Sequence, residues 1–177
     1  MSLDLKSLVR TIPDYPKPGI LFRDITTLIE HPEGFKESVE AIAAGYRGQG
    51  FTHVAGIEAR GFIFGAGVAI ALGVGFVPVR KRGKLPGTTI GQNYALEYGV
   101  DTIEIHADVL DENHKVLVVD DLIATGGTAI AAVGLIRRTG ASCDHAAFVI
   151  DLPDLGGAAK LKAEQVEVSA LMAFEGH

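Results

Sequence analysis

Apolar residues fall into short continuous runs and into longer stretches with helical spacing. Continuous runs are typical of buried strands, and they predict strands at residues 52–57, 75–79, 115–119, 145–150 and 166–171. Phe35, Val39, Ile42 and Tyr46 recur at helical spacing and predict an amphipathic helix over residues 34–47. Further helices are predicted over residues 61–72 and 128–139. Strands that alternate with helices predict an α/β fold with a central, mostly parallel sheet flanked by helices.

Three other segments have different patterns. Residues 101–108 alternate apolar and polar side chains, which predicts a half-exposed antiparallel strand in a flap beside the main sheet. Prolines and a glycine punctuate the first twenty or so residues, which are expected to form a small irregular cap. Residues 62–79 carry no charge over a length that could span a membrane, but Gly73, Gly75 and Pro78 interrupt them. A buried helix, a glycine turn and a buried strand are therefore predicted there.

Composition narrows the class of protein. The 177 residues fit a single domain over 1–177, and 47% hydrophobic with 21% charged residues indicates a globular protein. A net charge of -6 argues against nucleic acid or an acidic membrane surface as a partner. Cys143, which cannot form an internal disulfide, and a charged N-terminus without a secretory signal both suit the cytoplasm.

The segment VLVVDDLIATGGTA, residues 116–129, concentrates the candidate chemistry. A predicted strand runs into Asp120 and Asp121, at the sheet edge where α/β proteins bind ligands. The loop after them leads into a helix N-terminus, whose free N–H groups and dipole favour a phosphate; it consists of Ala124, Thr125, Gly126, Gly127 and Thr128. Carboxylates accept hydrogen bonds from ribose hydroxyls or hold magnesium through water. The segment therefore predicts a ribose 5-phosphate site, whereas the spacing of the histidines predicts no metal site held by the protein.

This segment resembles the phosphoribosyl-diphosphate motif of the type I phosphoribosyltransferases. Four further segments resemble, in order, motifs of the members of this family that use adenine: PDYPKPGILFRDIT, GIEARGFIFG, RKRGKLPG and LEYG. Together the five segments span Pro13 to Leu152. The resemblance implies the type I fold, with a small N-terminal hood at about 1–30 and a mobile lid and antiparallel flap at about 80–106.

The resemblance also implies a function. Such an enzyme transfers the 5-phosphoribosyl group from phosphoribosyl diphosphate to N9 of adenine, giving AMP and diphosphate in purine salvage. Mg²⁺ would arrive with phosphoribosyl diphosphate rather than occupy a dedicated protein site, and the protein would be a homodimer.

Individual roles follow from the same resemblance. Asp120 and Asp121 would be catalytic, with Glu97 as an acid or base near N7 or N9 of the purine. The diphosphate would contact Glu58, Ala59 and Arg60, where a strained peptide brings backbone N–H groups close, together with Arg80 and Lys84 of the lid. Arg80 and Lys84 could act within the chain or from a neighbouring subunit. Adenine would contact Leu21, Phe22, Arg23 and Leu152.

The residues by themselves leave alternatives open. Glu58 and Arg60 fit an ordinary solvated turn between a strand and a helix, and an isolated Glu97 is usually just exposed. A sister enzyme for hypoxanthine, guanine, xanthine or orotate would share the central motif. A non-catalytic regulator that senses phosphoribosyl diphosphate is a further alternative, although no appended helix-turn-helix or basic domain supports it.

Overall fold

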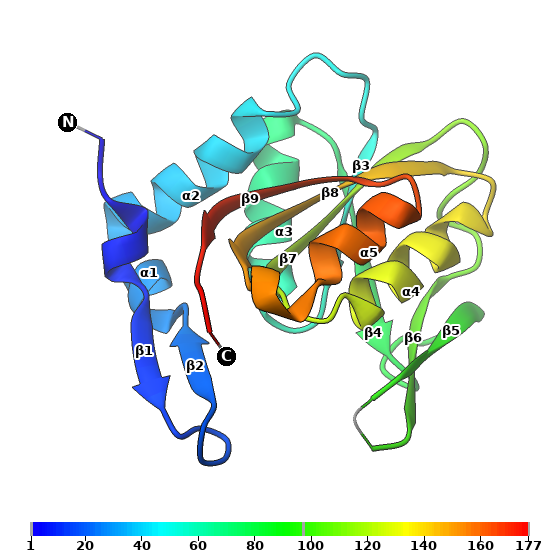
Figure 1. Cartoon of the computed structure of the whole chain (residues 1–177). Helices are drawn as coiled ribbons and strands as arrows, with labels where there is room; N and C mark the ends of the chain where they lie inside the picture. The colour runs from blue at the N-terminus through cyan, green and yellow to red at the C-terminus, as the bar shows by residue number, and fades with distance from the viewer. Residues whose placement is uncertain (1, 97, 177) are drawn as a thin grey trace.

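A seven-stranded sheet forms the centre of the computed structural model, which describes residues 2–96 and 98–176 (Figure 1). Its strand order is β5-β6-β4-β3-β7-β8-β9. The five strands from β4 to β9 are parallel: β4 (Gly75–Lys81), β3 (His53–Ile57), β7 (Lys115–Ile123), β8 (Ser142–Asp151) and β9 (Glu167–Ala173). β6 (Val100–His106) pairs antiparallel with β4, and β5 (Thr89–Ala95) pairs antiparallel with β6. The predicted mostly parallel sheet is confirmed.

Helices cover both faces of this sheet. α2 (Pro32–Ala44) and α3 (Arg60–Leu72) pack against one face, and α4 (Gly127–Arg137) and α5 (Gly157–Ala163) pack against the other (Figure 1). Side chains alternate along a strand, so Val116 and Val118 of β7 enter one apolar cluster while Leu117 and Val119 enter the second. The continuous apolar runs therefore reflect strands that are buried on both faces.

The strand order changes direction at β3. From β3 the chain crosses through α3 to β4 on one side, while β7 lies on the other side of β3. The loops that follow β3 and β7 consequently leave toward opposite faces and open a space between the carboxyl ends of these strands. The loop with the predicted diphosphate residues, after β3, and the predicted 5-phosphate loop, after β7, both begin there.

The N-terminal hood is more regular than the expected irregular cap. It contains a short 3-10 helix η1 (Leu5–Leu8), an antiparallel hairpin of β1 (Arg10–Pro13) and β2 (Leu21–Asp24), and α1 (Thr26–Glu30). Pro16 and Pro18 lie in the connection between the two strands, where no ladder hydrogen bond is lost. The prolines thus mark a turn, and the prediction of an irregular cap was wrong.

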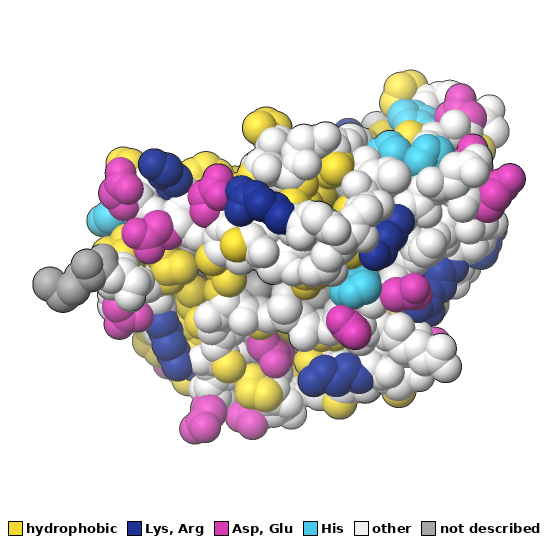
Figure 2. Space-filling model, turned by 90° about the horizontal axis from the view of Figure 1, so that it is seen from above, with side chains coloured by type: hydrophobic (Ala, Val, Ile, Leu, Met, Phe, Trp, Pro, Cys, Tyr) yellow, Lys and Arg dark blue, Asp and Glu magenta, His cyan; other side chains and the backbone are white. Residues whose placement is uncertain are grey.

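Two ribbons project from the same side of the body. The β1–β2 hairpin and the β5–β6 flap extend downward on either side of Figure 1. β6 confirms the predicted half-exposed antiparallel strand, whereas its partner β5 had not been predicted. On the opposite side, charged side chains of both signs are interspersed over the described surface (Figure 2).

The apolar segment 62–79 forms most of α3, a turn at Gly73 with φ of 69°, and the first part of β4, as predicted. Within residues 2–96 and 98–176, no helix has the length and hydropathy needed to cross a membrane.

Several element boundaries differ from the predictions. β7 was expected to end at Asp120, but it continues to Ile123 because β8 pairs with it as far as Ile123↔Asp151. α4 begins at Gly127 and ends at Arg137, and α2 begins at Pro32, two residues earlier than predicted. α5 and the 3-10 turn η2 (Pro153–Leu155) had not been predicted.

Candidate active site

The two acids lie within the last part of β7 and contact the start of α3. Arg60 donates from Nε to Oδ2 of Asp121 at 2.6 Å, and Asp121 itself is only 5% exposed. The backbone N–H of Asp121 donates to Oδ1 of Asp120 at 2.8 Å. Asp121 is therefore a paired, buried anion, and Asp120 stands beside it.

These contacts change the pKa values of Asp120 and Arg60. Burial and the adjacent charge of Asp121 raise the pKa of Asp120 well above its usual value. Burial alone would lower the pKa of Arg60, but the carboxylates of Asp121, Asp120 and Asp24 outweigh it, and the pKa is raised. Arg60 thus stays cationic among three acids, and adding negative charge beside Asp120 is costly unless a cation accompanies it.

The loop between β3 and α3 holds the predicted diphosphate residues Glu58, Ala59 and Arg60. The Glu58–Ala59 peptide bond is cis. At Gly61, a side chain would place Cβ 2.7 Å from Oδ1 of Asp120 and 3.1 Å from the carbonyl of Val119. Only glycine permits this approach, which holds the loop directly against β7.

Glu58 is not simply solvated. Its Oε1 accepts hydrogen bonds from the backbone N–H of Lys81 at 2.6 Å and from Nε of Arg80 at 3.2 Å. Arg80 also donates to the carbonyl of Lys84 at 3.3 Å. The structure therefore joins Arg80, within one chain, to the loop that contains Arg60.

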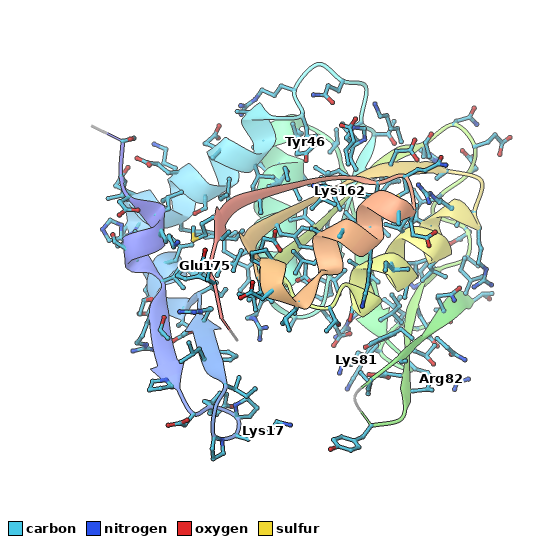
Figure 3. The ribbon with its side chains drawn as sticks, viewed as in Figure 1. Lys17, Tyr46, Lys81, Arg82, Lys162 and Glu175 are labelled. Carbon is cyan, nitrogen blue, oxygen red and sulfur yellow. The ribbon has the colours of Figure 1, made fainter. Side chains whose placement is uncertain are left out.

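The lid, defined as Arg80 to Gly87, connects β4 with the flap. Gly83 and Gly87 adopt positive φ values of 79° and 83°, which suit turns within this loop. The side chain of Lys84 is exposed, and Lys81 and Arg82 lie beside the β5–β6 flap (Figure 3). The basic residues of the lid thus lie around the same opening as Glu58.

The predicted phosphate loop surrounds a small cavity of about 120 Å³. Its lining comprises Asp120 and residues 122–129, which include all five predicted loop residues. Gly126 has φ of 85°, and its Cβ would lie 2.9 Å from Cα of Gly157. At Gly127 the nearest atom to an added Cβ is the carbonyl oxygen of Ala95 at 3.8 Å. Gly126 is consequently the glycine on which the loop conformation depends, with Gly157 packed beneath it.

A tyrosine of the flap contacts the end of the same loop. Tyr94 donates to Oδ2 of Asp101 at 3.2 Å, and the Thr128 hydroxyl also hydrogen bonds to Tyr94. Burial and the charge of Asp101 raise the pKa of Tyr94, so its phenol stays neutral and can donate. The flap is thereby coupled to the N-terminus of α4.

The predicted adenine residues Leu21, Phe22 and Arg23 form β2. Among the described strands β2 pairs only with β1, so half of its backbone N–H and C=O groups point away from that partner. Phe22 contacts Tyr15 edge to face, with ring centroids 5.2 Å apart. The free edge of β2 can therefore offer a backbone donor and acceptor to a planar ligand.

The other two side chains proposed to lie near adenine have structural contacts. Arg23 donates to Thr11 Oγ1 at 2.7 Å and to the carbonyl of Glu175 at 2.9 Å, and it stacks on Phe174. Leu152 is 7% exposed and belongs to the apolar cluster that also contains Ile25 of the hood. Both residues tie the hood to the body, and Leu152 has little surface left for a ligand.

Sequence reasoning had not identified four residues of this region, namely Asp24, Tyr94, Gly157 and Lys160. Asp24 accepts hydrogen bonds from the Thr26 backbone at 2.9 Å and from Nε of Arg10 at 3.1 Å. Gly157 could have been identified from the sequence, because the Gly156-Gly157 pair after β8 indicates a loop that packs closely. Glu97, the proposed acid or base, lies outside the described residues.

Comparison with known proteins identifies the family of this chain. The family model for the phosphoribosyl transferase domain matches residues 25–167. The adenine phosphoribosyltransferase of Parvibaculum lavamentivorans is 61% identical over 175 residues, which cover 99% of this chain and 100% of the relative.

Solved structures agree as well. The crystal structure of adenine phosphoribosyltransferase from Thermoanaerobacter pseudethanolicus is 45% identical, with a TM-score of 0.92, and the match covers 97% of this chain and 98% of that one. The enzyme from Saccharomyces cerevisiae, complexed with an imino-altritol bisphosphate and adenine, is 38% identical, with a TM-score of 0.90 and coverage of 96% and 97%. This chain belongs to the adenine phosphoribosyltransferase family, whose members carry the phosphoribosyl transferase domain.

Proposed function

We propose that this protein transfers the 5-phosphoribosyl group from phosphoribosyl diphosphate to N9 of adenine, giving AMP and diphosphate. The observation that carries the proposal is the convergence of two loops at the change in strand order. One loop surrounds a phosphate-sized cavity after β7, and the other, after β3, carries Arg60 and holds Arg80 through Glu58. Asp120 and Asp121 lie between the two loops.

Each group has a role in this reaction. The bond between C1 of the ribose and the diphosphate oxygen breaks, a bond between C1 and N9 forms, and the proton of N9 passes to a base, the role proposed for Glu97. Positive charge develops on the ribose, where the carboxylates stabilise it, and negative charge develops on the departing diphosphate, where Arg60 and Arg80 are positioned. Because both loops are held against β7, most of the catalytic effect would come from orientation and electrostatics.

Adenine is selected by the free edge of β2. Its amino group at position 6 and its N1 acceptor match one backbone C=O and one N–H. Hypoxanthine and guanine reverse both groups, and two mismatched buried hydrogen bonds should lower turnover by roughly 10³-fold or more. The side chain of Arg23 is held by Thr11 and Glu175, so it takes no part in this selection.

Mg²⁺ is proposed to arrive with phosphoribosyl diphosphate. No group of three or more histidine, cysteine, aspartate or glutamate residues with the geometry of a metal site occurs among the described residues. Asp121 is already paired with Arg60, which leaves Asp120 as the carboxylate that could contact the ion through water. An ion held mainly by the diphosphate would neutralise the leaving group.

A homodimer in the cytoplasm completes the proposal. Ile63 and Ile70 of α3 are 39% and 82% exposed and lie two helical turns apart on one face, and an exposed apolar patch of this kind supports a surface for a partner subunit. Light scattering of the purified protein would give twice the mass of the chain, and Ile70→Glu would shift that mass toward the monomer.

The central test measures diphosphate release from phosphoribosyl diphosphate with a panel of bases. Turnover with adenine and almost none with hypoxanthine or guanine is expected. Comparable kcat/KM for adenine and hypoxanthine would refute the assignment of the base. Binding of phosphoribosyl diphosphate without diphosphate release from any base would instead indicate a sensor.

A further inference from the structure

The phosphate loop lacks a cation of its own. Among the described residues that line its cavity of about 120 Å³ none is basic, and one is the acid Asp120. Backbone N–H groups and the hydroxyls of Thr125 and Thr128 are neutral donors. A phosphate monoester with nearly two negative charges would therefore gain from a cation close to the loop.

α5 is fixed to this loop through its first residue. The N–H of Gly157 donates to the carbonyl of Ala124 at 3.0 Å, and the backbones of Gly126 and Gly157 pack closely enough to exclude a side chain at either position. At the other side of the helix, Leu161 is fully buried in the core. α5 has only seven residues, from Gly157 to Ala163, so its side chains keep a constant position relative to the phosphate loop.

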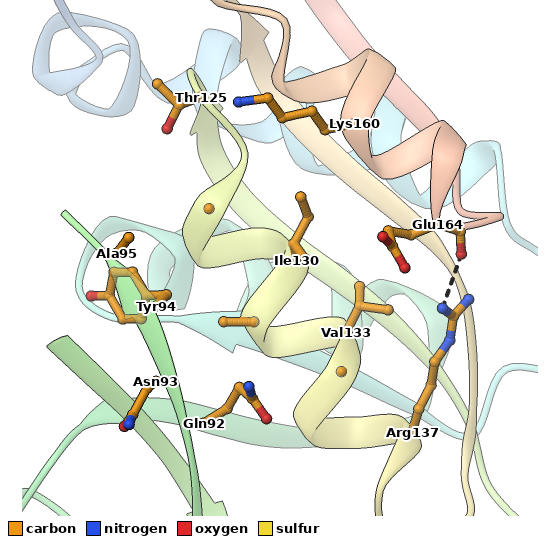
Figure 4. Close-up of a pocket in the computed structure, with 13 residues that line it drawn as sticks. Gln92, Asn93, Tyr94, Ala95, Thr125, Ile130, Val133, Arg137, Lys160 and Glu164 are labelled. Carbon is orange, nitrogen blue, oxygen red and sulfur yellow. Dashed lines mark hydrogen bonds between the residues drawn. The ribbon is translucent and has the colours of Figure 1, made fainter. Parts of the chain in front are cut away.

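Lys160, in the last turn of α5, extends toward the loop. It lines a larger cavity of about 520 Å³ together with Thr125 and Gly127 of the loop. Figure 4 shows its ammonium end directed toward Thr125. Within the described residues Lys160 forms no ion pair, whereas Arg137 in the same cavity donates to the Glu164 carbonyl at 2.9 Å and to Asp144 at 3.0 Å. Of these two cations, Lys160 alone is available to a ligand.

We propose that Lys160 is a substrate-binding residue that contacts the 5-phosphate group of phosphoribosyl diphosphate and of AMP. This inference rests on the proposed function, because it assigns a cation to the site already placed at the loop. Lys160 would reach the phosphate from the larger cavity that it lines together with Thr125 and Gly127 of the loop. Its charge would offset the unfavourable field of Asp120 and Asp121, which is felt by any anion at this end of β7.

Calorimetry with three ligands tests the proposal on the purified protein: AMP and ribose 5-phosphate, which carry the 5-phosphate, and inorganic diphosphate, which does not. Lys160→Ala should lower the affinity for AMP and for ribose 5-phosphate about tenfold and leave the affinity for diphosphate unchanged. Lys160→Arg should restore most of the affinity. Alanine is a good helix former and Lys160 is exposed, so the variant should fold normally.

Lys162→Ala is the matched control, because Lys162 lies on the same helix but lines a different pocket and should leave all three affinities unchanged. If Lys160→Ala bound AMP as tightly as Lys162→Ala does, the inference would be overturned. An equal loss for AMP and diphosphate would overturn it too, since that result indicates a general charge effect. A parent protein that binds neither AMP nor ribose 5-phosphate would overturn the proposed function and this inference with it.

Discussion

Replacing Gly126 with alanine should destabilise the protein and disrupt the phosphate loop together. Gly126 has φ of 85°, a conformation that costs an alanine roughly 1–2 kcal/mol. The new Cβ would also lie 2.9 Å from Cα and 3.0 Å from the carbonyl oxygen of Gly157. Both atoms are backbone and cannot rotate away, so overpacking adds about 1–3 kcal/mol. The free energy of unfolding should therefore fall by about 2–5 kcal/mol.

Urea denaturation of Gly126→Ala and of the parent protein measures this difference directly. Gly127→Ala provides the control, because the nearest atom to its Cβ lies 3.8 Å away and its backbone is already helical. Its stability should stay within about 0.5 kcal/mol of the parent. Calorimetry should also show that Gly126→Ala loses affinity for AMP. A denaturation midpoint equal to that of the parent would refute the packing argument.

Three further predictions concern charge. Asp120→Asn should raise the free energy of unfolding by about 0.5–2 kcal/mol while lowering diphosphate release, because it removes a buried charge beside Asp121. Since the pKa of Asp120 is raised in the folded protein, the parent should lose stability as pH rises toward that pKa. Thermal denaturation over a range of pH measures this loss, and an identical loss in Asp120→Asn would contradict the prediction. The Thr26 and Arg10 hydrogen bonds lower the pKa of Asp24 from 3.8 to about 2, so Asp24 contributes about 2 kcal/mol above pH 4. This contribution should vanish as pH falls through about 2, and Asp24→Asn should flatten the acid limb of a stability–pH curve; an unchanged limb would count against it. Arg80→Ala combined with Lys84→Ala should lower the affinity for phosphoribosyl diphosphate far more than the affinity for AMP, because AMP has no diphosphate at C1. Binding titrations measure both affinities, and equal losses would indicate a general effect of charge.

Local patterns in the sequence predicted much of the fold correctly. Continuous apolar runs indicated strands buried on both faces, and both faces of β7 are indeed covered. The run from Asp120 to Thr128 indicated a phosphate loop, and all of these residues except Asp121 line one small cavity. Such features depend on residues close together in the chain, so periodicity and turn chemistry record them directly. The wrong prediction for the hood also had a local cause. The prolines there occupy a turn between two short strands, and on the sequence alone they indicated an irregular segment.

Local patterns in the sequence do not predict contacts between segments that are distant in the chain. Arg60 and Asp121 are 61 residues apart, and their pairing depends on β3 and β7 being neighbours in the sheet. The closeness of Gly126 to Gly157 depends on where α5 packs.

The sequence by itself predicted the five parallel strands, the helices α2, α3 and α4 and the phosphate loop, because burial and turn formation leave periodic and local patterns. Only the tertiary structure decided which charges meet. Strand order and helix packing placed Arg80 against Glu58, joined Tyr94 to Thr128 and directed Lys160 toward the loop. No local pattern encodes such pairs, because their energies arise only after the sheet has assembled.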